Sequence, residues 1–207
     1  MTRIPKVPSR PPERLTRAPG DIVARGLALW RIHSAKGPHP IRWNALRTFG
    51  PLNTARFDPH PRPQGNHPGY GVAYTAFDIS TCVAEVFQAS RTIAVTDEYD
   101  ATGWTPAREL QLLDLTDTWA LRNGASNSLA TWKRPTCRAW AAVIRENWPD
   151  LDGLLSRSTM TGREMVALFD PSATAFPVAP SFRRPLDHPA MQAIMVRSAA
   201  ECGYTLA

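Results

Sequence analysis

A long stretch rich in proline and glycine restricts the fold of this chain more than any other feature. Residues 34–70 contain seven prolines and four glycines, which interrupt helices and the pairing of strands. An irregular segment of this length inside a compact domain usually has a function. We therefore expect a lid or a pocket wall here, with RTFG (47–50) and ARFD (55–58) as the parts pinned to a sheet.

The segments on either side of this stretch alternate between short strands and helices. Their apolar patterns predict strands for LALWRIH (27–33), GVAYTA (71–76), TIAVT (92–96), ELQLLDLT (109–116), DGLLSRST (152–159) and MVALFD (165–170). The intervening segment DEYDATGWTPAR (97–108) is predicted to be a connecting loop. The sequence therefore predicts a single mixed α+β domain without internal repeats.

Helix signals accompany three of the remaining segments. DISTCVAEVFQAS (78–90) is predicted to be a helix capped at Asp78 or Ser80, with Val83, Val86 and Phe87 on its core face. TCRAWAAVIREN (136–147) and HPAMQAIMVRSAAECG (188–203) are predicted helices, the second closed by Gly203. TWALRNGASNSLATWKRP (118–135) is a mixed segment in which a short helix would break near Gly124.

The length and the ends of the chain indicate one domain with an appendage. The 207 residues suffice for one hydrophobic core, and two would be cramped. We expect a flexible, basic, proline-rich arm over residues 1–20, or an arm ordered on contact, followed by a catalytic domain over 21–207. The arm lacks the apolar core of a secretory signal, and no apolar run approaches 18 residues, so no membrane span is expected.

Charge and cysteine content indicate which classes of partner and which cellular compartment are possible. The net charge of +6 fits nucleic-acid binding, but also a pocket for a phosphorylated ligand or an acidic protein partner. The three cysteines are widely spaced and odd in number, which indicates free thiols in a reducing compartment, by default the cytoplasm. The five histidines lack metal-ligand spacing, so neither a metal site nor a bound cofactor is expected.

Four side chains between residues 31 and 85 are candidates for chemistry. Arg31 and Arg56 lie in or beside predicted strands, and arginine is well suited to a forked grip on phosphate. Tyr74 ends a short strand, and Glu85 is a lone acid in an apolar helical run, where burial is costly without a partner or a role. This set indicates a site for a nucleotide whose sugar carbon becomes positive during reaction. Structural ion pairs, Arg56 with Asp58 for example, are the alternative for the three charged residues, and a core tyrosine with a solvated hydroxyl is the alternative for Tyr74.

In their order along the chain, these pieces resemble the RES-domain family. The resemblance spans about residues 25–172 and includes LWRIHS with Arg31, ARFDP with Arg56, and GVAYTAFDISTCVAEVF with Tyr74 and Glu85. It continues through LLDLT, TCRAWA, DGLLSRST and MVALFD. Two features depart from the family's pattern: Ala55 replaces a frequent glycine, and the family's serine could be Ser158 or be replaced by Thr136.

The resemblance implies an ADP-ribosyltransferase-like fold and degradation of NAD+ by a bacterial toxin. NAD+ would be the substrate and inorganic phosphate or water the second reactant, giving phosphorolysis or hydrolysis of the nicotinamide–ribose bond. Arg31 and Arg56 would grip phosphates, Tyr74 would shape the nicotinamide side, and Glu85 would stabilise the ribose cation, with Ser158 or Thr136 as the family's serine. An Xre-like antitoxin would cover the site, and nucleic acid would be contacted only through it.

Two other functions remain open from the sequence. ADP-ribosyl transfer to a macromolecule would need an acceptor-binding surface, which the sequence neither shows nor excludes. A non-catalytic nucleotide- or nucleic-acid-binding module would show salt-sensitive binding through the basic arm. The sequence also leaves the oligomeric state open, homo-oligomers included.

Overall fold

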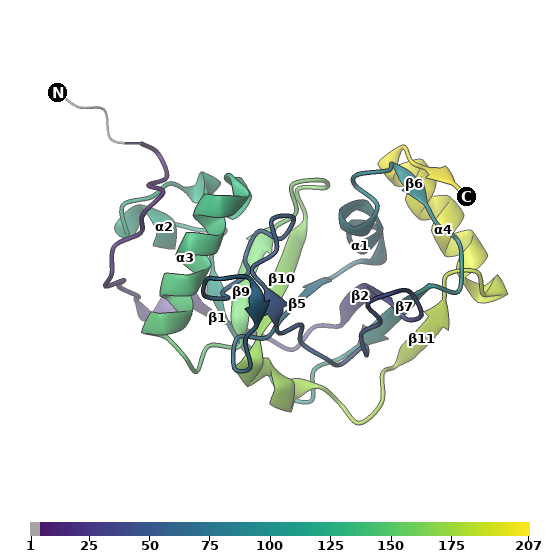
Figure 1. Ribbon diagram of the computed structural model, residues 1–207, viewed down its shortest axis with the longest axis horizontal. Coiled ribbons are helices and arrows are strands. Elements are labelled where there is room, and N and C mark those ends of the chain that lie inside the picture. The colour runs from purple at the N-terminus through teal and green to yellow at the C-terminus, as the bar shows by residue number, and fades with distance from the viewer. Residues whose placement is uncertain (1–4) are drawn as a thin grey trace.

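One curved mixed sheet carries the molecule, as a computed structural model that describes residues 5–207 shows (Figure 1). Its strands lie in the spatial order β1-β8-β9-β10-β5-β2-β7-β11. Their bounds are β1 Ile22–Arg25, β2 Leu29–Ser34, β5 Val72–Ala76, β7 Tyr99–Trp104, β8 Leu110–Asp114, β9 Gly153–Arg157, β10 Glu164–Phe169 and β11 Phe182–Pro185. Neighbouring strands are antiparallel except for the parallel pair β8 and β9. The predicted mixed α+β class is thus confirmed.

Four α-helices, three 3-10 helices and two small sheets complete the described part of the chain. The helices are α1 Ile79–Val86, α2 Trp119–Arg122, α3 Arg134–Asn147, α4 Pro189–Cys202, η1 Pro19–Asp21, η2 Asn127–Thr131 and η3 Asp170–Ala175. The small sheets pair β3 Phe49–Gly50 with β4 Gly65–Asn66, and β6 Thr92–Ile93 with β12 Thr205–Leu206. No helix within residues 5–207 is both long and apolar enough to cross a membrane.

Local signals explain where the main helices begin and end. Asp78 is the N-cap of α1 and its carboxylate accepts a hydrogen bond from the Thr81 N–H at 2.8 Å, as predicted. Gly203 ends α4 in the left-handed conformation with φ +67°, which glycine adopts at little cost. α2 ends at Arg122, and Gly124 with φ +79° follows it, as the sequence indicates.

Two groups of helices cover different parts of the sheet, to either side of its middle (Figure 1). Trp119 of α2 and Trp140 of α3 are fully buried in one core, against the strands β8, β9 and β10. Val83 of α1 and Met191 and Met195 of α4 are buried in a second core over β2 and β7. The middle strands β5 and β2 lie where the two helical groups meet, and some of their side chains face the space between these groups.

The segment 97–108 corrects the sequence prediction, because it contains the strand β7 and not only a loop. β7 pairs with β2 from Leu29↔Trp104 to Ser34↔Tyr99, and with β11 on its other edge. Asp100 and Gly103 interrupt the run of apolar and β-branched residues that would predict a strand. The buried Asp100 accepts a hydrogen bond from Arg183 at 2.6 Å, and Gly103 leaves room for the ring of Trp30. Pairing with β2 and β11, which are distant in sequence, thus stabilises a strand whose own residues have weak strand propensity.

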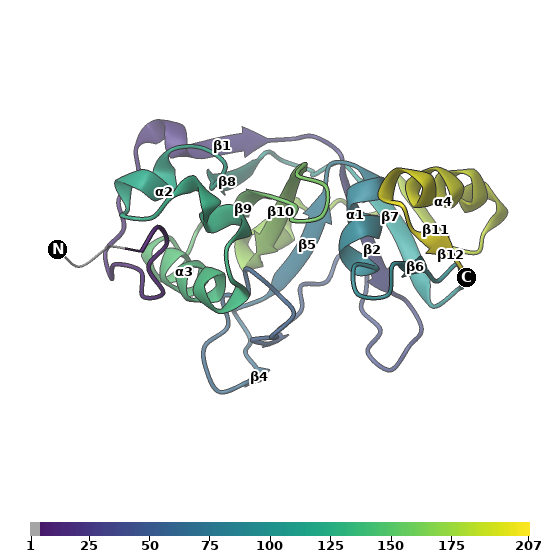
Figure 2. The same cartoon turned by 90° about the horizontal axis from the view of Figure 1, so that it is seen from above.

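The proline-rich stretch 34–70 is largely irregular and projects from the sheet as two loops, the second of which carries β3 and β4 (Figure 2). Arg47 forms an isolated bridge with Val72, the first residue of β5. The Phe57 N–H donates a hydrogen bond to the Tyr74 hydroxyl at 3.0 Å. Both predicted attachment points, RTFG and ARFD, are thus bound to β5.

The N-terminal segment after residue 4 lies along α3 (Figure 2). Val7 and Leu15 are buried in the core that contains Trp140, and the Trp140 indole N–H donates to the Pro8 carbonyl at 2.9 Å. Asn147 holds the same segment through the Leu15 N–H and the Glu13 carbonyl. The described part of the arm is thus in contact with the domain, and the division of the chain at residue 20 stays a prediction.

Candidate active site

A cavity of about 830 Å³ opens between the middle of the sheet, helix α1 and the proline-rich stretch. We call it the first chamber. Its walls are mostly apolar and come from β2, β5, β10, α1 and the stretch 38–52, with Ile32, Ile41, Phe49, Ala73, Val86 and Met165 among them. This volume lies in the range of ordinary small-molecule sites. The proline-rich stretch is thus a pocket wall, as its composition predicts.

Glu85 projects from the last turn of α1 to the edge of this chamber and is half-buried. Its Oε1 atom accepts a hydrogen bond from the Ser158 hydroxyl at 2.6 Å, across 73 residues of sequence. The Ser158 oxygen in turn accepts from the Met160 N–H at 3.0 Å and the Thr161 N–H at 3.1 Å. Because these two donors occupy the serine's lone pairs, its single hydrogen is directed to the carboxylate.

Gln88, one helical turn after Glu85, contacts the other carboxylate oxygen. Its amide nitrogen lies 2.8 Å from the Glu85 carbonyl and 3.4 Å from Oε2, and its amide oxygen accepts from Arg134 at 3.1 Å. Arginine can only donate, so this contact assigns the orientation of the amide. Arg134, Gln88 and Ser158 together fix the direction of the Glu85 carboxylate.

Arg31 lies on β2 at the floor of the first chamber and is buried. Its Nη1 atom donates to the carbonyls of Trp43 at 3.1 Å and Ala45 at 2.8 Å, which attaches the proline-rich stretch to the sheet. Burial, followed by the nearby charge of Arg47, lowers the pKa of Arg31 to about 10. The guanidinium is therefore still cationic at neutral pH.

Tyr74 belongs to a buried network that the sequence did not single out. Asp58, fully buried, accepts hydrogen bonds from the Tyr74 hydroxyl at 3.0 Å, Arg47 Nη2 at 2.6 Å and the Leu52 N–H at 2.8 Å. Desolvation, and then the charge of Asp58, raise the pKa of the Tyr74 hydroxyl well above its ordinary value. Tyr74 is therefore a neutral donor that orients the pocket wall.

Arg56 lies outside the first chamber and lines a second one, of about 640 Å³. The two chambers share Arg47, Leu52, Tyr74, Glu85, Val86 and Met165, so Glu85 stands at the boundary between them. Arg56 donates to the Trp132 carbonyl and to the Thr159 hydroxyl. Within the described residues it pairs with no carboxylate, and Asp58, its suspected partner, binds Arg47 instead.

The structure separates the two candidates for the family's serine. Ser158 lies against Glu85, whereas Thr136 is buried in the first turn of α3 and lies outside the residues that line the two chambers. Val86 also differs from expectation. It was predicted on the core face of its helix, but it is 40% exposed and lines both chambers. The residues from Ser80 to Ala84 are buried, whereas Val86 is the last residue of the helix and faces the chambers.

Sequence analysis missed Arg47, Asp58, Gln88 and Arg134. Gln88 could have been found, because it follows Glu85 by three positions in the helix predicted over 78–90, and such residues share one face of a helix. In the structure α1 ends at Val86, and Gln88 lies in the turn after it. Arg47, Asp58 and Arg134 lack such a signal, because they reach the site from the irregular stretch and from α3.

Comparison with known proteins identifies a family and a similar fold. The family model described as "RES domain" matches residues 28–187, about three-quarters of the chain. A protein of known structure, the complex titled "Crystal structure of the M.tuberculosis MbcT-MbcA toxin-antitoxin complex", shares the fold at 15% sequence identity. Its TM-score is 0.55, with 84% of this chain and 92% of the other covered. No curated protein sequence matches significantly.

The mixed sheet and the carboxylate at the boundary of two cavities define an α+β protein with a candidate site beside the middle of its sheet. The family match over most of the chain then shows that it belongs to the RES-domain family.

Proposed function

We propose that this protein is the toxin of a toxin–antitoxin pair and that it cleaves the nicotinamide–ribose bond of NAD+. The observation that carries the proposal is the Glu85 carboxylate, held by Ser158 and Gln88 at the boundary of two chambers. Membership of the RES-domain family and the fold shared with a toxin–antitoxin complex support it.

The chemistry of the bond suits a single oriented carboxylate. As the C–N bond breaks, its electron pair leaves with nicotinamide, which departs as a neutral molecule, and the ribose carbon becomes positive. A preorganised anion beside that carbon stabilises the transition state more than the ground state. A second carboxylate acting as general acid, which many glycosidases need, is unnecessary for a neutral leaving group.

The cations of the site suit the rest of the substrate. Arg31 and Arg47 line the first chamber, and Arg47 and Arg56 line the second. Guanidinium groups bind phosphate oxygens in forked geometry, so they would hold the dinucleotide's phosphates or an incoming phosphate. The new bond to the ribose carbon would then come from a phosphate oxygen, giving phosphorolysis, or from water, which releases a proton to solvent.

An Xre-like antitoxin is the proposed partner. Phe49 and Val86 line the first chamber and are 50% and 40% exposed, which is unusual for large apolar side chains unless something covers them. A segment of the antitoxin inserted at this mouth, near Arg31 and Arg56, would bury them and close the site. A complex of the two proteins that leaves Phe49 and Val86 exposed would contradict this part of the proposal.

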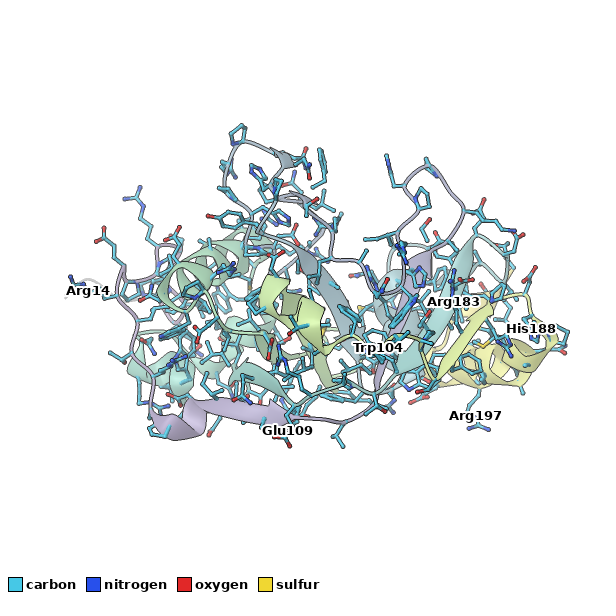
Figure 3. The ribbon with its side chains drawn as sticks, turned by 90° about the horizontal axis from the view of Figure 1, so that it is seen from below. Arg14, Trp104, Glu109, Arg183, His188 and Arg197 are labelled. Carbon is cyan, nitrogen blue, oxygen red and sulfur yellow. The ribbon has the colours of Figure 1, made fainter. Side chains whose placement is uncertain are left out.

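The deciding experiment measures nicotinamide release from NAD+ by the purified chain, with and without phosphate. The wild type is expected to release nicotinamide, and Glu85→Gln to be slower by about 100-fold or more, because a preorganised charge at the reacting carbon is lost. Glu109→Gln is the matched control, because Glu109 is exposed and points outward from the molecule (Figure 3).

The products distinguish the alternatives. Release that requires phosphate indicates phosphorolysis, and release without it indicates hydrolysis. ADP-ribose attached to a macromolecule would indicate transfer instead. The absence of nicotinamide release from folded, partner-free wild type would refute the enzymatic proposal and favour a binding module.

A further inference from the structure

The second chamber collects positive charge that the structure leaves without carboxylate partners. Arg56, Arg134 and Arg157 line it, from the proline-rich stretch, α3 and β9 respectively. Arg47 at the boundary adds a fourth guanidinium, although Asp58 neutralises that one. Glu85 is the one acid among the lining residues, so the chamber carries a net positive charge.

The hydrogen-bond partners of these arginines are neutral. Arg56 donates to the Trp132 carbonyl and the Thr159 hydroxyl, Arg134 to the Gln88 amide oxygen at 3.1 Å, and Arg157 to the Gly162 carbonyl at 3.4 Å. Within residues 5–207 none of the three forms an ion pair.

Some other arginines of the chain are paired with acids, as Arg108 is with Asp152 through two hydrogen bonds of 2.6 and 2.7 Å. Others, such as Arg31 and Arg138, donate only to backbone carbonyls, but they do so singly. The three arginines of the second chamber differ because they line one cavity together without a carboxylate partner among the described residues. Like charges held together cost free energy unless an anion binds between them.

We infer that the second chamber is a subsite for a phosphate anion, bound by Arg56, Arg134 and Arg157. The choice of phosphate as the ligand rests on the proposed function, whereas the evidence for an anion subsite is the cavity and the unpaired positive charge that lines it. Each guanidinium keeps donors beyond those used in the contacts above, and forked donors match the oxygens of a phosphate group.

The position of the subsite relates it to the chemistry. Glu85, Tyr74 and Met165 separate it from the mostly apolar first chamber, which suits an aromatic, uncharged ring. An anion in the second chamber would therefore lie on the other side of the carboxylate from nicotinamide. Arg134 also orients Gln88 against Glu85, so an anion bound to Arg134 would be linked to the carboxylate through that amide.

The test measures the binding of two probes, inorganic phosphate and ADP, at constant ionic strength, because salt screens such contacts. Calorimetric titration would compare wild type with Arg134→Gln and Arg157→Gln. Each variant is expected to weaken binding of at least one probe by about tenfold or more, because a hydrogen bond to a charged group is lost. Arg197→Gln, an exposed position on α4, is the control and should bind as wild type does (Figure 3).

The two probes distinguish the source of the anion. If the variants weaken the binding of inorganic phosphate alone, the subsite holds the free co-substrate. The KM for phosphate should then rise while the KM for NAD+ stays constant. If the variants weaken the binding of ADP, the subsite holds the pyrophosphate of the dinucleotide. Arg157→Gln is the cleaner variant, because Arg157 donates to the Gly162 carbonyl and, among the described residues, forms no hydrogen bond with Gln88 or Glu85.

Equal affinity of wild type, Arg134→Gln and Arg157→Gln for both probes would overturn the inference, as would wild type binding neither probe. These binding results do not depend on turnover. A protein that binds phosphate through these arginines but releases no nicotinamide would refute the proposed reaction and keep the subsite.

Discussion

Ser158 donates its hydroxyl hydrogen to Glu85 at 2.6 Å, and two backbone N–H groups of the turn after β9 hold the serine oxygen in place. Ser158 is 1% exposed, so water cannot readily replace its hydroxyl. In the proposed reaction Ser158 is thus a positioning residue, which acts on the substrate through the carboxylate.

Removing this hydroxyl should slow the reaction more than it weakens substrate binding. Ser158→Ala loses a hydrogen bond to a charged group, worth about 1.5–3 kcal/mol, so kcat for nicotinamide release should fall about 10- to 150-fold. The KM for NAD+ should change much less. Ser156→Ala, two residues earlier on β9, is the control, because its buried hydroxyl has no hydrogen-bond partner in the described structure. Equal kcat values for the two variants would contradict the role of Ser158.

Thr136 should be dispensable for the chemistry. It is buried in the first turn of α3 and apart from both chambers, so Thr136→Val, which removes the hydroxyl and keeps the shape of the side chain, should retain nicotinamide release within about twofold of wild type. Steady-state kinetics beside Ser158→Ala provide the comparison. A loss as large as that of Ser158→Ala would transfer the family's serine role to Thr136.

Asp58 should stabilise the pocket wall. Oδ1 of Asp58 accepts from Arg47 and Tyr74, and Oδ2 accepts from the Leu52 N–H. In Asp58→Asn the charge opposite Arg47 is lost and one of these oxygens becomes an amide donor that faces another donor, so the free energy of unfolding should fall by about 3 kcal/mol. Urea unfolding measures this loss. Asp97→Asn, which breaks the exposed pair with Lys36, should change stability little. Similar midpoints for the two variants would show that the buried network is not stabilising.

Stability should decrease as the solution becomes mildly acidic. Burial, and then the charge of Arg31, lower the pKa of His33 below its ordinary value of 6.5, and burial also lowers that of His60. The unfolded chain therefore binds more protons than the folded chain below about pH 6.5. The contribution of these histidines to stability is complete above pH 6.5 and is lost as the pH falls through their folded pKa values.

Thermal unfolding between pH 8 and pH 5 tests this dependence. His33→Gln removes one titrating group and can keep the hydrogen bond that His33 Nε2 makes with the Thr102 hydroxyl at 3.1 Å. Its melting temperature should fall less steeply with pH than that of wild type. His39→Gln, at a position on the exposed part of the proline-rich stretch, should follow the wild-type curve. Parallel curves for His33→Gln and wild type would exclude His33 as a source of the dependence.

Much of the fold was readable from local patterns, and the errors have a common cause. Helix α1 with its Asp78 cap, helix α4 with Gly203, and the strands β5, β9 and β10 follow from periodicity and end signals. β7 was missed because its two unusual residues, Asp100 and Gly103, make sense only beside Arg183 and Trp30.

Local sequence patterns were sufficient for most of the elements, for the family, and for the candidates Arg31, Tyr74 and Glu85, because propensity, capping and ordered motifs act over a few residues. Only the tertiary structure decided that Ser158 and not Thr136 lies against Glu85, and that Arg56 belongs to a second chamber with Arg134 and Arg157. These contacts join residues far apart in the chain. Their geometry depends on how the sheet and two helical groups pack, which local patterns do not encode.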